Sequence, residues 1–112
     1  MDSDKEETVA LGGNIELVGF RDLDGASLVI VKKVVGNYAR KISEVVRNVE
    51  KLKLSLKPVH KTESSQVNEL HAQLIFAGKQ LNASETDRNL FFAIDRVLKK
   101  IEAEASKFVE QA

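Results

Sequence analysis

The chain has 112 residues, with 17 lysines and arginines balanced by 17 aspartates and glutamates, and it contains no cysteine. This length predicts one domain, and the lack of cysteine excludes disulfides, thiolate metal sites and zinc fingers and favours a reducing cytoplasm. No segment approaches the roughly 20 apolar residues of a membrane span, and the first residues lack the apolar core of a secretory signal, so we expect a cytoplasmic protein without a membrane partner.

The charges are unevenly distributed along the chain. Residues 1–10 hold four acids against Lys5, about −3 in all, which leaves 16 basic and 13 acidic residues, about +3, in residues 11–112. Such a polar segment cannot bury enough apolar surface to offset its ordering entropy. We expect a disordered acidic N-terminal tail over residues 1–12, which could compete with an anionic partner, and a single α+β domain over residues 13–110.

The first regular elements are a strand and a long helix. Residues 14–18 alternate after two glycines and predict a strand that ends at Gly19. From Asp22 or Asp24 onward, apolar residues recur at spacings of three and four, which is typical of one helix face. They are Leu28, Val31, Val35, Tyr38, Ile42, Val45 and Val49.

Local propensity argues against this helix. Its first half is rich in β-branched residues, and Gly36 in a helix interior costs about 1 kcal/mol relative to alanine. The alternative is an extra strand from Ser27 to Val35 before a shorter helix. We favour the long helix, because burial of a persistent apolar face outweighs propensity differences of a few tenths of a kcal/mol per residue.

Period-two alternation then predicts two strands. Residues 51–57 place leucines on one face and mainly lysines on the other, and Pro58 is expected to end this strand. A polar link over residues 60–68 follows. Residues 69–76 alternate again and stop at a tight turn over residues 77–79.

A third strand and a second helix complete the domain. Residues 80–85 return from the turn, and Thr86 or Asp87 is expected to cap a helix whose apolar face runs from Leu90 to Ile101. The order is therefore β-α-β-β-β-α. Two helices packed on one face of a four-stranded sheet, an α+β two-layer sandwich, would bury every apolar stripe.

Several segments carry a family resemblance. The stretch Lys51–Pro58, the segment Glu69-Leu-His-Ala-Gln-Leu, the Gly78 turn and the run from Asp87 to Asp95 resemble the ribosome hibernation promoting factors, the ribosome-associated translation inhibitors. Leu17-Val18-Gly19, followed by Asp22-Leu23-Asp24, is similar to that family's first strand, loop and helix start. The resemblance covers residues 14–108, and its most specific part is Asn89-Leu-Phe-Phe-Ala-Ile-Asp95.

The resemblance implies a function and partners. It implies a stress-response protein that binds the small ribosomal subunit and its ribosomal RNA, blocks the channel of messenger and transfer RNA, and preserves the particle. It implies no cofactor, no metal and no small-molecule substrate. The chain departs from the family in its acidic tail, in the glutamates around Lys107, where members carry a lysine-rich helix end, and in lacking the second, dimerising domain of longer members. It resembles the short, one-domain type, and we expect a monomer off the ribosome.

RNA binding of this kind needs cations on a rigid surface, because phosphate contacts supply most of the affinity. Three groups qualify: one on the outer face of the first helix, one on the solvent side of the second strand, and one on the last helix. In that order they are Lys32, Lys33, Arg40, Lys41 and Arg47; Lys51, Lys53 and also Lys57; and Arg88, Arg96, Lys99 and Lys100. Arg40, Arg47, Arg96 and Lys100 are the foremost candidates, although any one such charge more often belongs to an ordinary solvated face.

Other classes of site find less support. His60 and His71 lack a cysteine or close carboxylate frame for a metal, and the helical aromatics fall on apolar stripes, which leaves Phe20 for base stacking. No nucleophile–base set or glycine-rich phosphate loop is present, which argues against an enzyme. The alternative function is a non-ribosomal RNA-binding or protein-interaction module on the same double-stranded-RNA-binding-like scaffold.

Overall fold

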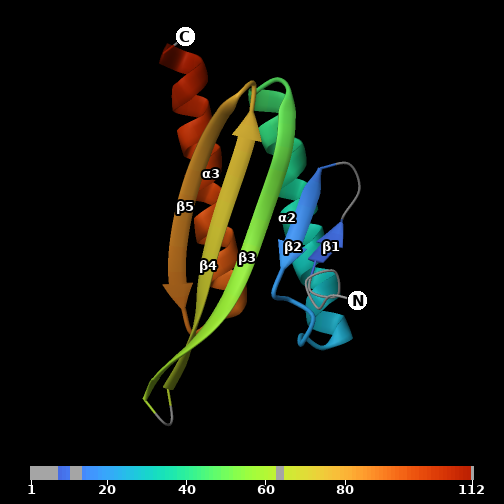
Figure 1. Ribbon diagram of the computed structural model, residues 1–112, viewed down its shortest axis with the longest axis vertical. Coiled ribbons are helices and arrows are strands. Elements are labelled where there is room, and N and C mark those ends of the chain that lie inside the picture. Colours follow the sequence, from blue (N-terminus) through green and yellow to red (C-terminus); the bar gives the residue numbers. More distant parts are fainter. Residues whose placement is uncertain (1–7, 11–13, 63–64, 112) are drawn as a thin grey trace.

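The computed structural model describes residues 8–10, 14–62 and 65–111. The elements are β1 (Thr8–Ala10), β2 (Ile15–Val18), α2 (Gly25–Val45), β3 (Val49–Thr62), β4 (Ser65–Phe76), β5 (Lys79–Asp87) and α3 (Leu90–Gln111). Figure 1 shows the strands side by side in one layer with both helices behind them. The predicted α+β order of β-α-β-β-β-α, with two helices on one face of the sheet, is confirmed.

The sheet has the strand order β1-β2-β3-β4-β5. The pair β2–β3 is parallel, and α2 forms the connection between these two strands. The other pairs are antiparallel. The short strand β1 extends the predicted four-stranded sheet at the β2 edge, so three residues of the stretch predicted as a tail, Thr8–Ala10, lie in a strand. The rest of that tail lies outside the described residues.

One row of the sheet shows how the core forms. Leu17, Leu54, Ala72 and Ala83 lie opposite one another across β2 to β5. Because side chains alternate along a strand, this row and its neighbours two residues away point to the same face. The buried residues of the helices pack against that face: Val31, Val35, Tyr38 and Ile42 from α2, and Ala93, Ile94, Val97, Leu98, Ile101 and Ala105 from α3.

The helix α2 forms despite its β-branched residues. Asp24, one of the two start positions that the sequence left open, caps it by accepting the Ser27 N–H at 3.1 Å. The alternative strand from Ser27 to Val35 is therefore wrong, since burial of Val31 and Val35 outweighs local propensity. The helix ends at Val45, earlier than predicted, and Val49 belongs to β3.

The β3–β4 hairpin is longer than predicted. Residues expected to form a polar link pair across it, with Val59 opposite Val67 and Thr62 opposite Ser65. Pro58 does not end β3 but lies opposite Asn68 within the strand. It is tolerated there because β2 pairs only with Leu52–Ser55, so β3 has a free edge at Pro58.

The start of α3 also differs from its predicted cap. Asn89 is the capping residue, because its side-chain oxygen accepts the Phe92 N–H at 3.0 Å. Asp87 supports the cap from outside the helix by accepting the Asn89 N–H at 2.7 Å. The turn before β5 is tight, with Ala77 and Gly78 both at positive φ, as in a two-residue hairpin loop.

Two glycines allow a direct test of the packing between β2 and β3. Gly19 has φ +85°, and a Cβ there would lie 2.3 Å from the Leu56 carbonyl oxygen, whereas a Cβ at Gly36 would meet no atom within 4 Å. We expect Gly19→Ala to lower the free energy of unfolding by more than about 1 kcal/mol. The same exchange at Gly36 is expected to raise it by up to about 1 kcal/mol. Urea denaturation measures both, and an unchanged midpoint for Gly19→Ala would contradict this packing.

Candidate nucleic-acid interface

The outer side of α2 carries the most basic surface of the predicted groups. Lys33 and Arg40 lie two turns apart on the side opposite the buried residues, and Lys32 and Lys41 flank them; all four are exposed. We call these four residues the α2 basic face. Within the described part of the chain, Lys32, Lys33 and Arg40 form no ion pair, and α2 itself contains one acid, Glu44. These cations are available to an anionic partner.

Arg47 does not belong to the α2 basic face. The helix ends before it, with Val46 in an extended conformation and Asn48 at φ 59° where the chain reverses. Arg47 lies instead beside an apolar hollow of about 280 Å³, where Phe76 and Phe108 also contribute. Arg47 was predicted on the outer face of the first helix, and this placement is wrong because the helix is shorter than its apolar pattern suggested.

Tyr38 connects the two helices beneath the α2 basic face. Its hydroxyl donates to the Asp95 carboxylate on α3 at 2.6 Å. Burial and this hydrogen bond raise the pKa of Tyr38, while the same bond holds the pKa of Asp95 below its ordinary value, helped by Lys99. Lys41 lies 5.0 Å from the centre of the Tyr38 ring, and Lys99 lies 3.5 Å from Asp95. Lys41 and Lys99 are thus placed around one carboxylate at the seam between the helices.

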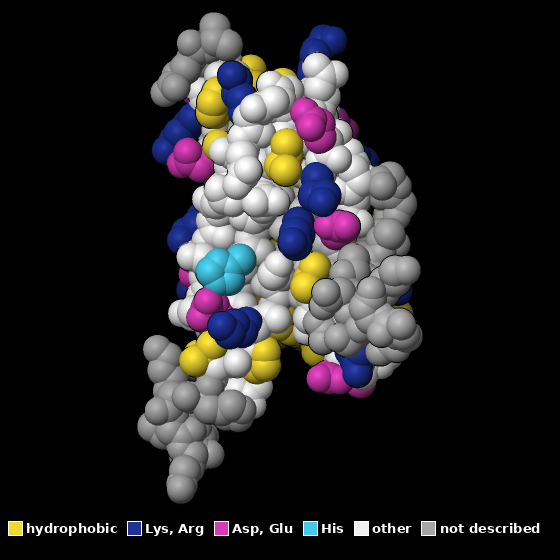
Figure 2. All heavy atoms as spheres, in the orientation of Figure 1, with side chains coloured by type: hydrophobic (Ala, Val, Ile, Leu, Met, Phe, Trp, Pro, Cys, Tyr) yellow, Lys and Arg dark blue, Asp and Glu magenta, His cyan; other side chains and the backbone are white. Residues whose placement is uncertain are grey.

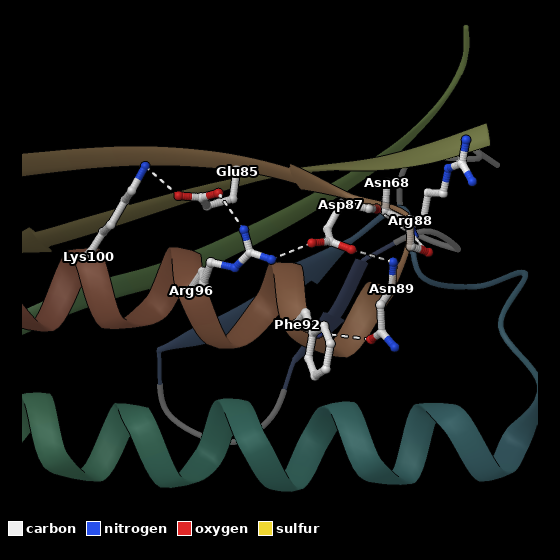
Figure 3. Close-up of polar contacts among 8 residues, drawn as sticks. All are labelled: Asn68, Glu85, Asp87, Arg88, Asn89, Phe92, Arg96 and Lys100. Atoms are coloured by element: carbon white, nitrogen blue, oxygen red, sulfur yellow. Dashed lines mark hydrogen bonds and ion pairs between the residues drawn. The ribbon is translucent and has the colours of Figure 1, made fainter. Parts of the chain in front are cut away.

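Arg96 and Lys100 of α3 face the sheet and form ion pairs with acids there. Lys100 Nζ lies 2.6 Å from Glu85 Oε2, and Arg96 bridges Glu85 and Asp87, as Figure 3 shows. Lys100 also donates to the Ser84 carbonyl at 3.1 Å. The two carboxylates are only 17% and 22% exposed. Arg96 and Lys100, predicted as foremost RNA ligands, therefore already hold partners with opposite charge.

Arg88 and Asp87 occupy the connection between β5 and α3. The backbone N–H of Asn89, with Arg96 as a further cause, lowers the pKa of Asp87. Figure 3 shows the Arg88 side chain directed away from the ion pairs of Asp87 and Arg96. The Asn68 side chain donates to the backbone carbonyl oxygens of Asp87, at 3.2 Å, and Arg88, at 3.0 Å. Arg88 thus lies apart from the α3 cations with which it was grouped.

The lysines of β3 point to the face of the sheet that the helices leave open. Lys51 lies 3.3 Å from Glu16 on β2. Lys53 lies in a row with Gln73 and Asn82 on the neighbouring strands. Lys57 is exposed near the strand's free edge. The structure therefore separates the predicted cations into the α2 basic face, a neutralised α3 group and an open-sheet group.

Aromatic residues are distributed differently from the prediction. Phe20, expected to be available for stacking, is fully buried in the core. Phe92, expected in the core, is 61% exposed near the start of α3. Phe108 is half-exposed and packs edge-on against Phe76. At about 3.6 residues per turn, Phe92 falls on the side of α3 opposite the buried residues, whereas Phe91 lies at the edge of the apolar stripe.

Metal sites and membrane-spanning helices are both absent from the described residues. No group of three or more histidine, aspartate or glutamate side chains there could hold a metal ion. No helix in those segments combines the length and apolar character that crossing a bilayer requires.

Two solved structures share the fold of this chain. The Thermus thermophilus Protein Y N-terminal domain superposes with a TM-score of 0.54 at 20% sequence identity, over 76% of this chain and 84% of that one. A ribosomal subunit interface protein from Coxiella burnetii also gives 0.54, at 14% identity, over 85% and 93% of the two chains. This chain shares their fold. The fold that the sequence resemblance implied is therefore confirmed. No family model and no curated protein matches the sequence.

The Tyr38–Asp95 bond predicts a pH-dependent contribution to stability. Because the pKa of Asp95 is lowered in the folded state, the stabilisation is present above about pH 4, the unfolded value, and is lost as the pH falls through the lowered pKa. We expect Tyr38→Phe to lower the free energy of unfolding by about 1 kcal/mol at neutral pH. This difference should shrink in acid, as measured by urea denaturation between neutral and acidic pH.

The double-mutant cycle with Asp95→Asn provides the control. In that background the hydroxyl has no carboxylate to bind, so Tyr38→Phe should cost less and its cost should no longer vary across the acid range. An equal, pH-independent cost in both backgrounds would show that the ring position, not the hydrogen bond, is responsible.

Proposed function

We propose that this chain is a ribosome-associated, non-enzymatic factor that binds small-subunit ribosomal RNA through the α2 basic face. The observation that carries the proposal is the set of cations on the outer side of α2, three of which form no ion pair within the described residues. The shared fold with a Protein Y domain and a ribosomal subunit interface protein supports the ribosome as the partner.

The choice of α2 over α3 rests on electrostatics. Cations that bind phosphates contribute affinity by releasing counterions from the nucleic acid. Arg96 and Lys100 would first have to give up Glu85 and Asp87, which would leave two partly buried carboxylates without partners. Lys33 and Arg40 form no ion pair within the described residues, so binding a phosphate would leave no carboxylate without a partner. The arginine is suited to this role because its guanidinium can hold a phosphate with two donors.

The binding mode accounts for an inhibitory role. A rigid helix surface that contacts phosphates recognises the shape of folded RNA rather than its sequence, because side chains cannot read the deep groove of an A-form helix. Seated in the channel of messenger and transfer RNA, the domain would exclude both and inhibit translation while preserving the particle. The channel site and the inhibition of translation are carried over from the family that the sequence resembles.

Charge reversal on α2 tests the proposal. We expect Arg40→Glu to weaken cosedimentation with purified small subunits, and Lys33→Glu combined with Arg40→Glu to abolish it at physiological salt. The dependence of log affinity on log salt should become shallower by about 0.9 for each phosphate that the variant no longer neutralises. Translation in an extract should recover in parallel.

Lys107→Glu is the matched control, because it makes the same charge change on an exposed lysine of α3. It should cosediment like the wild type, and thermal melting should show both variants folded. If the double variant still cosediments normally, the α2 basic face is not the ribosomal site. If the wild type binds RNA duplexes but not ribosomes, the alternative of a non-ribosomal RNA-binding module is favoured.

A further inference from the structure

The face of the sheet opposite the helices is uncovered by any described element, and Figure 2 looks onto it. Its side chains alternate with those of the core and form rows across β3, β4 and β5. Lys53, Gln73 and Asn82 make one row, and Ser55, His71 and Ser84 make the next. This surface is therefore built from polar groups on rigid strands.

Five of these polar side chains surround a shallow hollow of about 160 Å³, whose lining is Lys53, Ser55, His71, Ala72, Gln73, Asn82 and Ala83. The hollow is smaller than the roughly 300–1,000 Å³ of a typical small-molecule pocket. It accordingly suits one flat polar group better than a whole metabolite.

The lining has the chemistry of base recognition. The amides of Gln73 and Asn82 each offer donors and an acceptor, and Ser55 offers a hydroxyl. Unpaired RNA bases expose edges that bind such groups, and they stack on flat side chains such as the His71 imidazole. In a duplex these edges are occupied or lie in grooves, so the hollow favours a single strand.

The charges of this face complement a phosphate backbone. Lys53 and Lys57 form no ion pair within the described residues. Two acids of the face have partners on the face itself: Glu16 lies 3.3 Å from Lys51, and Glu69 lies 2.5 Å from His71. Lys53 and Lys57 are four residues apart, which places them roughly 13 Å from each other along the strand. The face thus presents two cations without ion pairs on one rigid strand.

We propose that the open face of the sheet binds single-stranded RNA, with one unpaired base in the hollow and phosphates of the same strand on Lys53 and Lys57. This inference depends on the proposed function in one respect, which is that RNA is the partner. The site lies on the side of the sheet opposite the helices, so the α2 basic face and the hollow contact different RNA segments. The domain would then lie between a folded RNA surface and an unpaired strand.

Fluorescence anisotropy with the full chain and a short fluorescein-labelled single-stranded RNA of mixed sequence tests this site. We expect Lys53→Gln to weaken binding and to reduce the slope of log affinity against log salt by about 0.7. The double variant Gln73→Ala with Asn82→Ala should weaken binding about tenfold and leave the slope unchanged. The two variants thus separate a phosphate contact from base contacts.

Lys107→Gln is the control, because it removes one exposed lysine of α3, a helix on the other face of the sheet. It should bind the single strand like the wild type, and thermal melting should show all variants folded. The inference is overturned if the wild type does not bind the single strand, or if the Lys53 and amide variants bind it unchanged. It is also overturned if Arg40→Glu, rather than Lys53→Gln, removes single-strand binding. None of these results alters cosedimentation through α2, so this site and the proposed function fail separately.

Discussion

Both helices must bury their apolar stripes on the same face of the sheet, and the placement of every charged surface depends on this packing. Alternation along β3 and β4 means that burying Leu54 and Ala72 directs Lys53 and Gln73 to the opposite face. The helical period means that burying Val35 directs the nearby basic residues of α2 outward. The two surfaces proposed to bind RNA are thus consequences of one core.

The same packing explains why the cations of α3 are poor ligands for RNA. On β5, the positions that continue the core-facing side after Leu81 and Ala83 are Glu85 and Asp87. Burying these acids against α3 without partners would be costly. Arg96 and Lys100 compensate them, so their charge is used within the fold. The outer side of α2 packs against none of the described strands, so its cations have no buried acid to neutralise.

The contact between α2 and α3 includes a polar interaction as well as apolar packing. Tyr38 is buried, yet its hydroxyl reaches Asp95 on α3, and Lys41 and Lys99 lie around this pair. A hydrogen bond between a buried hydroxyl and a carboxylate fixes one geometry in a way that apolar contacts do not. The α2 basic face is consequently held in a fixed orientation relative to α3 and the sheet.

The sequence by itself determined the elements whose signals are local. Alternation predicted the inward leucines of β3 and β4, spacings of three and four predicted both helices, and Asp24 was identified as a possible cap, because each of these patterns depends on a few neighbouring residues. Only the tertiary structure decided the features that depend on distant partners. It placed Pro58 inside a strand with a free edge, paired Arg96 and Lys100 with acids of β5, and joined Lys53, His71 and Asn82 around one hollow. Strand register and ion pairs join residues far apart in the chain, and no local period encodes them.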